Sequence, residues 1–307
     1  MAVKRKTELT TGAVAGSNGA YAGTKLTLSR EEARGVMLAA QGLLHAPARE
    51  ATLKDVRALI DRLGAVQIDT ISVVERSQYL VLWSRLGAYD ATLLDAVLYP
   101  HRDTFEYWGH AASILPMSDY RYYRPKMLRY LEHIYTGDAD WMQQNPEVVA
   151  QTLQTIRERG PMASADFERP ADGRRATAWD WHGPKDSRRA LAVLWTTGDL
   201  MVHSRRAGGQ KVYDVRERVL REAFGKKVPG DDELPTPEER LRHFARRTVS
   251  ALGIVTPSWL WDYFRLSLPE GAAKNKRTAG IALLDEMAHA GLVVPATVDG
   301  LGEPGYV

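Results

Sequence analysis

The chain has 307 residues, of which 44% are apolar and 26% charged, and its formal net charge at pH 7 is +3. This is the composition of a globular protein of two or three domains. The absence of cysteine excludes disulfides, thiolate catalysis and cysteine-ligated metal centres. No apolar run approaches the roughly 18 residues of a membrane span, and no apolar stretch follows the basic N-terminus as in a secretory signal. We therefore expect a cytoplasmic protein without a membrane partner.

Charge is segregated in the second half of the sequence. Residues 205–227 hold eight basic and three acidic side chains, whereas residues 231–239 hold five acids and no base. Such segregation can create a positive face on a nearly neutral protein. A solvated surface with chance clustering explains the same pattern, so charge alone does not indicate an anionic partner.

The N-terminal part predicts a tail followed by mainly helical structure. Residues 1–24 are rich in Gly, Ala, Ser and Thr and lack apolar periodicity, which predicts disorder. Ser29, followed by Glu31 and Glu32, is typical of a capped helix start, and Gly64 ends a second helix. The pattern predicts helices over 29–44, 53–63, 89–98 and 116–134, a strand over 65–71, and an aromatic strand or turn over 105–108.

The remainder predicts the same order of elements twice. Residues 136–146 indicate a linker, and residues 225–237 indicate a second one. Between them the pattern predicts helices over 148–159, 164–167 and 187–197, a loop over 170–185, and strands over 200–204 and 211–213 around a Gly-containing turn. After the second linker it predicts helices over 237–252, 258–266 and 277–290, then a strand over 292–297 with a hairpin signal at Asp299-Gly300.

Three helices followed by a β-hairpin are typical of a winged helix. We therefore expect a mainly α fold with short β-hairpins, arranged as tandem winged helices. The predicted domains are a disordered tail (1–24), an N-terminal winged-helix-like domain (25–135), a second winged helix (146–224) and a third (236–307). The sequence stops partway through the expected hairpin of the third domain, so we expect that domain to be incomplete at its C-terminus.

The strand at 65–71 carries a possible catalytic pair. Side chains alternate along a strand, so Gln67 and Asp69 point the same way, about 6.6 Å apart at roughly 3.3 Å per residue. A carboxylate beside a carboxamide can hold a water molecule, accept its proton and stabilise a developing cation. The alternative is that both residues belong to the polar face of a half-buried strand.

The predicted second winged helix carries possible DNA contacts. Its third helix begins with Lys185, Ser187, Arg188 and Arg189, where a winged helix usually meets the DNA backbone. Arg205, Arg206 and Lys211 lie at the wing turn, where phosphate or minor-groove contact is possible. A solvated turn is the alternative. The aromatic segment 105–110 is interpreted as core packing, and Trp179 and Trp181 lie in the loop before the third helix.

Other catalytic signatures are missing from the sequence. It contains no P-loop, no G-x-S-x-G nucleophile elbow and no H-E-x-x-H motif, and its eight histidines are scattered. We therefore expect neither a metal nor another cofactor.

Three segments resemble the YcaQ/AlkZ family of bacterial DNA glycosylases with tandem winged helices. They are QIDTISVVERS (67–77), FEYWGHAASILP (105–116), and WDW (179–181) with the following RALAVLWTTGDL (189–200). The resemblance extends over about residues 26–307 and implies that Gln67-Ile68-Asp69 is the catalytic Gln-x-Asp motif of the YcaQ-like branch. Members of the family usually continue beyond the point at which this sequence stops.

That branch is associated with removal of N7-alkylguanine and with unhooking of interstrand crosslinks. The resemblance implies that Asp69 activates water and stabilises the oxocarbenium-like sugar, while Gln67 orients the water. It implies a monofunctional glycosylase acting on double-stranded DNA with alkylated or crosslinked guanine. We expect a monomer associated with the bacterial nucleoid.

Two other functions remain open at this point. A winged-helix transcription regulator would use the same basic helix start and wing but would have no use for Gln67 and Asp69 facing a cleft. A protein-interaction scaffold would show no salt-dependent DNA binding.

Overall fold

The computed structural model describes residues 23–45, 47, 49–69, 71–133, 136–167, 183–268 and 275–307, with only the backbone described at 133, 136 and 183–185. Nearly all of the predicted tail, and both Trp179 and Trp181, lie outside these residues. The chain forms two compact units: one takes residues up to 48, 62–64 and 236–307, and the other takes 49–61 and 65–235. None of the helices in the described ranges has the length and apolar character needed to cross a membrane.

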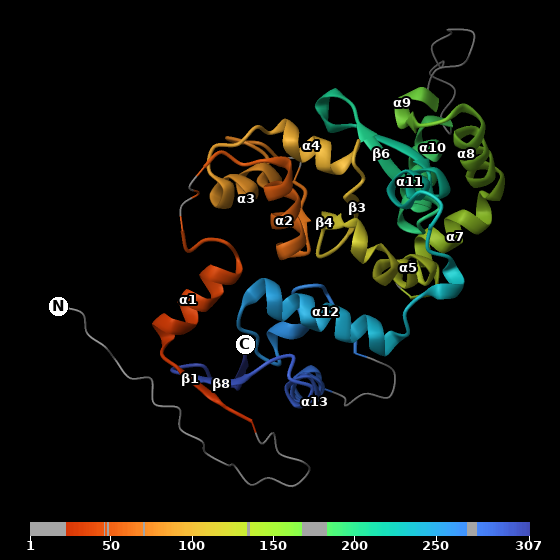
Figure 1. The fold of residues 1–307 in the computed structure, drawn as a ribbon. Helices are drawn as coiled ribbons and strands as arrows, with labels where there is room; N and C mark the ends of the chain where they lie inside the picture. Colours follow the sequence, from red (N-terminus) through yellow and green to blue (C-terminus); the bar gives the residue numbers. More distant parts are fainter. Residues whose placement is uncertain are drawn as a thin grey trace. The chain divides into compact units, whose positions relative to one another are not determined.

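The first unit combines the beginning and the end of the chain. Its strands form one sheet in the order β1-β8-β9, in which β1 pairs with β8 in parallel and β8 pairs with β9 antiparallel. Figure 1 shows β1 beside β8. The elements are β1 (Leu26–Leu28), α1 (Arg30–Ala40), α12 (Pro237–Leu252), the short 3₁₀ helix η4 (Trp259–Trp261), α13 (Lys276–His289), β8 (Pro295–Val298) and β9 (Gly305–Tyr306).

Two helices of this unit begin at capping boxes. The Ser29 hydroxyl accepts from the Glu32 amide at 3.2 Å, and the Ser29 amide donates to the Glu32 carboxylate at 2.9 Å. Thr236 and Glu239 repeat the arrangement at the start of α12, at 3.2 and 2.8 Å. Both predicted starts are therefore confirmed, because each box satisfies backbone donors that a helix start leaves unpaired.

The last residues of the sequence form a short antiparallel hairpin of β8 and β9. Its turn contains Gly300 at φ +74°, after which β9 returns along β8. Tyr306 also exchanges two backbone hydrogen bonds of 2.9 Å with Val255. The parallel pairing of β1 with β8 places residues 26–40 in the same unit as 236–307. The sequence had assigned them to the domain 25–135, and such a long-range pairing leaves no local signal.

The second unit begins with a three-stranded antiparallel sheet and its helices. The sheet order is β2-β4-β3, with β2 at one edge. The elements are α2 (Leu53–Leu63), β2 (Val66–Gln67), α3 (Ser77–Leu86), α4 (Thr92–Leu98), β3 (Thr104–Trp108) and β4 (Ala112–Pro116). The strand predicted at 65–71 is therefore shorter than expected, and α3 and β4 were not predicted.

Short helices follow where one long helix and a linker were predicted. They are the 3₁₀ helix η1 (Met117–Asp119), α5 (Tyr120–Leu128), α6 (Tyr130–His133) and α7 (Thr136–Gln144). The linker prediction at 136–146 is wrong. Trp141 supplies the physical reason, because its side chain is buried and the guanidinium of Arg189 lies 4.9 Å from its ring centroid. One buried aromatic anchors a helix whose other residues are mostly polar.

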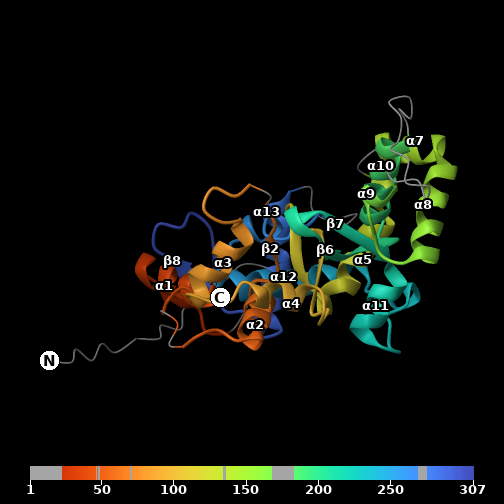
Figure 2. The ribbon, with the colours of Figure 1, turned by 90° about the horizontal axis from the view of Figure 1, so that it is seen from above.

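The order of helices and strands predicted for the second winged helix is present in this part of the chain. Its sheet order is β5-β7-β6, and α8, α9 and α10 gather on one side of the β6–β7 wing (Figures 1 and 2). Ile156, Leu191 and Leu194 are buried together in its core. The elements are α8 (Pro146–Arg159), β5 (Met162–Ala163), α9 (Ser164–Phe167), α10 (Gly183–Thr196), β6 (Leu200–Arg205), η2 (Ala207–Gly209), β7 (Lys211–Val215), α11 (Arg216–Phe224) and η3 (Asp231–Glu233).

Candidate functional site

Gln67 and Ile68 lie at the edge strand of the first sheet in the second unit. Gln67 pairs with Ser113 of β4, and the Ile68 amide continues the ladder by donating to the Ala112 carbonyl at 2.8 Å. Val66 is buried, Gln67 is exposed and Ile68 is half-buried. The extended backbone therefore turns Gln67 to the accessible side, as the sequence predicted.

Asp69 lies beyond the end of the strand. Its amide donates to the side-chain oxygen of Gln78 at 3.2 Å, and its Oδ1 accepts from the Ile71 amide at 2.9 Å. Gln78 is buried in the first turn of α3. The position of Asp69 is therefore fixed by α3 and by its own turn, whereas the sequence predicted that strand alternation alone would orient it.

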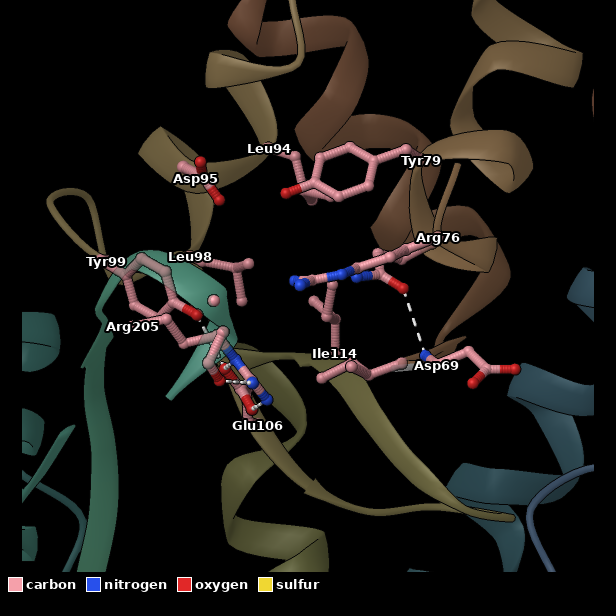
Figure 3. A pocket seen from close by; sticks show the side chains of 14 residues that line it. Asp69, Arg76, Tyr79, Leu94, Asp95, Leu98, Tyr99, Glu106, Ile114 and Arg205 are labelled. Carbon is pink, nitrogen blue, oxygen red and sulfur yellow. Dashed lines mark hydrogen bonds and ion pairs between the residues drawn. The ribbon is translucent and has the colours of Figure 1, made fainter. Parts of the chain in front are cut away.

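Asp69 and the wing line the same pocket, which has a volume of about 80 Å³. Such a volume admits several water molecules. Figure 3 shows Arg76 and Tyr79 reaching in from one side and Tyr99, Glu106 and Arg205 on the other, while the carboxylate of Asp69 points away from Glu106 and Arg205. The lining residues are Ile68, Asp69, Arg76, Gln78, Tyr79, Leu94, Asp95, Leu98, Tyr99, Glu106, Ile114, Arg205, Gly208 and Gly209.

A buried ion pair closes the wing end of this pocket. Arg205 donates to both oxygens of Glu106, from Nε at 2.8 Å and from Nη2 at 2.6 Å, and Tyr99 donates its hydroxyl to Oε1 at 2.8 Å. The Glu106 side chain is only 2% exposed. Burial by itself lowers the pKa of Arg205, but the hydrogen bonds and charge of Glu106 outweigh it, so the pKa is raised.

The structure therefore gives Arg205 an internal role, where the sequence predicted DNA contact. A third donor, Nη1, bonds to the Gly209 carbonyl at 2.5 Å, so the guanidinium ties the wing turn to β3. Sequence reasoning missed Glu106, because an acid between two apolar residues of a strand usually lies on the exposed face. Phe105 and Tyr107 are themselves buried, so the interpretation of their segment as core packing is confirmed there.

The other two wing residues also have partners in the protein. Arg206 forms a bidentate pair with Asp166 of α9, at 2.8 and 2.7 Å. The Lys211 ammonium lies 3.3 Å from the ring centroid of Trp195. Burial lowers the pKa of Lys211 to about 8, against an opposing effect of Glu106. Arg206 is thus the wing cation at the surface, with a side chain 46% exposed.

The described side chains at the start of α10 are half-buried or exposed. Arg189 donates to the Gly137 carbonyl at 2.8 Å and contacts Asp138 at 3.3 Å, while Arg188 is exposed and Ser187 is half-buried. The side chain of Lys185 lies outside the described residues. DNA contact by these four residues stays a prediction.

Several arginines of the basic segment 205–227 are matched by acids. Besides Arg205 and Arg206, Arg216 pairs with Asp231 at 3.0 Å and Arg218 with Asp214 at 2.5 Å. Asp231 belongs to the stretch predicted as a second linker, and it also receives two hydrogen bonds of 2.9 Å from Arg124. The charge segregation seen along the sequence is therefore partly cancelled in space.

No group of three histidines or acids suited to a metal ion occurs in the described ranges.

A sequence model of the family described as DNA glycosylase AlkZ-like matches residues 60–307. Among solved structures, the chain is similar to the Streptomyces sahachiroi DNA glycosylase AlkZ, with 15% sequence identity and a TM-score of 0.53. The similarity covers 92% of this chain and 70% of that one. At this identity the likeness establishes the fold, which is that of tandem winged helices.

Proposed function

From the membership of this chain in the AlkZ-like family of DNA glycosylases, which makes it a DNA N-glycosylase, we propose its substrate. The enzyme hydrolyses the N-glycosidic bond of N7-alkylated guanine. It also unhooks interstrand crosslinks that are formed through the N7 atom of guanine. Asp69 activates the attacking water and stabilises the cationic sugar. Gln67 orients the water. The reaction leaves an abasic site.

The chemistry of the substrate explains why few groups suffice. Alkylation at N7 gives guanine a positive charge, so the base leaves as a neutral molecule and needs no strong general acid. The transition state then requires a negative group near the oxocarbenium-like sugar and a base for the water. One carboxylate can do both, because the proton of the water is released as the new C–O bond forms.

The observation that carries the proposal is the arrangement of Gln67 and Asp69 around Ile68 at an accessible edge of the sheet. Within the described residues, the carboxylate of Asp69 accepts one hydrogen bond, from the Ile71 amide to Oδ1. A carboxylate has about four lone-pair sites, so Oδ2 can accept a proton from a bound water. The side chain of Gln67, exposed two residues earlier, can contact that water from the other side.

The pocket supports a cationic base as the leaving group. Tyr79 and Tyr99 line it together with Asp95. Aromatic faces and a carboxylate both favour a cation. Arg76 also lines the pocket, and its positive charge weakens the preference for a cation. Its guanidinium can instead bind a phosphate or the edge of the base nearest the sugar.

Unhooking follows from the position of Asp69 at the rim. A crosslinked guanine is tethered to the opposite strand and resists extrusion, which already costs a few kcal/mol for an ordinary base. A carboxylate that points away from the closed end of the pocket can reach the sugar without full enclosure of the base. The small volume of the pocket supports the same interpretation.

The test uses duplex DNA with one N7-methylguanine and measures abasic sites after heating in alkali. Wild-type protein should release the base. Asp69→Asn should lower the single-turnover rate by about 10²–10⁴-fold, the usual contribution of a general base, and Gln67→Ala should lower it by about tenfold. Asp140→Asn is the matched control, because Asp140 is an exposed acid on α7, away from the pocket.

DNA binding measured on the same duplex separates this proposal from its rival. Binding without base release by the wild-type protein would favour a non-catalytic winged-helix regulator. Release unchanged in Asp69→Asn would overturn the role of Asp69.

The monofunctional reaction is tested with borohydride, which traps a Schiff base between a lysine and an abasic site. No trapped complex is expected. Lys211 is the informative position, because its lowered pKa would favour an amine nucleophile. A trapped complex that disappears in Lys211→Arg would show a bifunctional enzyme.

A further inference from the structure

The loop between the proposed catalytic pair and α3 presents three exposed apolar side chains. Ile71, Val73 and Val74 are 71%, 93% and 86% exposed. They lie within four consecutive positions, whereas single exposed apolar residues are common on protein surfaces. Contiguous exposed apolar groups mark interaction sites.

Both ends of this loop are held by hydrogen bonds. At its start the Ile71 amide bonds to Asp69 Oδ1. At its end Arg76 is the N-cap residue of α3, and its carbonyl accepts from the Tyr79 amide at 3.0 Å. The loop is therefore anchored to the rim of the pocket while its apolar side chains extend away from the protein.

The loop also ends next to the wing. A Cβ placed on Gly209 would lie 3.0 Å from Arg76 Nη1, so the guanidinium packs against the wing turn. Gly209 in turn accepts the hydrogen bond from Arg205. The apolar loop, the pocket and the wing thus form one continuous surface of the second unit.

We propose that Ile71, Val73 and Val74 form an apolar wedge that enters the base stack beside the damaged nucleotide and brings its sugar to Asp69. This inference rests on the proposed function, and it adds the way in which the duplex is opened. Apolar side chains inserted between base steps unstack them and kink the duplex. Ile and Val suit this role because their β-branched side chains have few rotamers to lose on insertion.

The position of the loop favours DNA over a protein partner. Only one residue separates Ile71 from Asp69 in the sequence, and a hydrogen bond joins them. A protein bound to this loop would cover the rim at which the proposed chemistry takes place. The positive charge of Arg76 at the end of the loop suits the phosphates that flank an opened step.

The test compares Val73→Ser/Val74→Ser with wild type and with Val228→Ser, which removes an exposed valine elsewhere in the same unit. Duplexes carry 2-aminopurine next to the N7-methylguanine, so that unstacking is read as increased fluorescence on binding. Base release is measured in parallel on duplex and single-stranded DNA. Asp69→Asn keeps an oxygen that can accept from the Ile71 amide, so this variant retains the loop and removes the general base.

If the loop acts as a wedge, the two kinds of variant should lose different activities. Val73→Ser/Val74→Ser should lose the fluorescence increase and release the base from duplex DNA about tenfold more slowly, with nearly unchanged release from single strands, since unstacking is the step removed. Asp69→Asn should keep the fluorescence increase and lose base release. Val228→Ser should match wild type in both.

Other outcomes separate the two proposals. A valine double variant that unstacks and cleaves like wild type would overturn the wedge and leave the role of Asp69 intact. A wild type that unstacks DNA without releasing base would overturn the proposed reaction and leave the wedge intact. A change of oligomeric state in the double variant, with unstacking retained, would assign the loop to a contact between copies and overturn the wedge.

Discussion

The two ends of the pocket hold carboxylates in opposite conditions. At the wing end, Glu106 is buried and receives hydrogen bonds from Arg205 and Tyr99. At the open end, Asp69 is half-buried and its carboxylate points away from that pair. In the part of the chain that the structure describes, this carboxylate accepts one hydrogen bond, from the Ile71 amide. Both residues carry carboxylates and belong to the same unit, but their surroundings differ.

The difference separates an acid that stabilises the fold from one that can react. Glu106 accepts three hydrogen bonds from Arg205 and Tyr99, and its charge is neutralised by a guanidinium at 2.6 Å. Asp69 has no arginine or lysine partner among the ion pairs of the described residues. Substitutions of the Glu106–Arg205 pair at the wing end should therefore mainly lower the free energy of unfolding. Substitutions of Asp69 at the open end should mainly lower the rate of base release.

The largest effect on stability is expected for Glu106→Ala. This variant leaves Arg205 charged and mostly buried without its partner, so the free energy of unfolding should fall by about 3–5 kcal/mol. Urea denaturation measures the change. Glu106→Ala/Arg205→Met should recover part of the loss, because it removes the unpaired charge as well. A loss below about 1 kcal/mol in the single variant would contradict a structural role for the pair.

Lys211, which lies on the wing close to Glu106, should make the free energy of unfolding depend on pH. Burial lowers its pKa to about 8, whereas an unfolded lysine titrates near 10.4. As pH rises through this window the folded protein releases the proton first, so the unfolded state binds more protons and the folded state gains stability. Wild type should gain about 2 kcal/mol relative to Lys211→Met between pH 7 and pH 10.

Urea denaturation across this pH range measures that difference. Methionine keeps an apolar contact with Trp195 while removing the titration. Parallel pH profiles for the two proteins would contradict the assignment of the gain to Lys211.

Arg206 should behave differently from its neighbour Arg205. Its pair with Asp166 is at the surface, so Arg206→Ala should lower the free energy of unfolding by less than about 1 kcal/mol. If Arg206 exchanges Asp166 for a phosphate on DNA, the variant should reduce the slope of log K against log salt by about one. An unchanged slope, measured by fluorescence anisotropy, would remove Arg206 from the DNA-binding residues.

The smallest effect on stability is expected for Asp69→Asn. The amide oxygen of asparagine can still accept from the Ile71 amide, so the free energy of unfolding should change by less than about 0.5 kcal/mol while base release falls. Thermal denaturation checks this expectation. A loss of several kcal/mol would indicate that Asp69 stabilises the loop, and reduced activity would then have a structural cause.

Local sequence signals predicted the elements that local physics forms. The capped helix start at Ser29, the helix start at Pro237 and the wing at 200–213 appear close to the predicted positions. The prediction of a linker at 136–146 was wrong. Trp141 of α7 packs against Arg189, which lies some fifty residues later in the chain, so local signals could not reveal the helix. The pairing of β1 with β8 was missed for the same reason.

The site divides in a similar way. The sequence by itself determined the Gln-Ile-Asp motif, the winged-helix order of elements and the accessible side on which Gln67 lies, since alternation along an extended backbone needs only neighbouring residues. Only the tertiary structure decided that Gln78 bonds to the Asp69 backbone, that Arg205 pairs with Glu106, and that the wing turn and Asp69 share a pocket. Those outcomes depend on which distant charges and hydrogen-bond donors meet when the chain is folded.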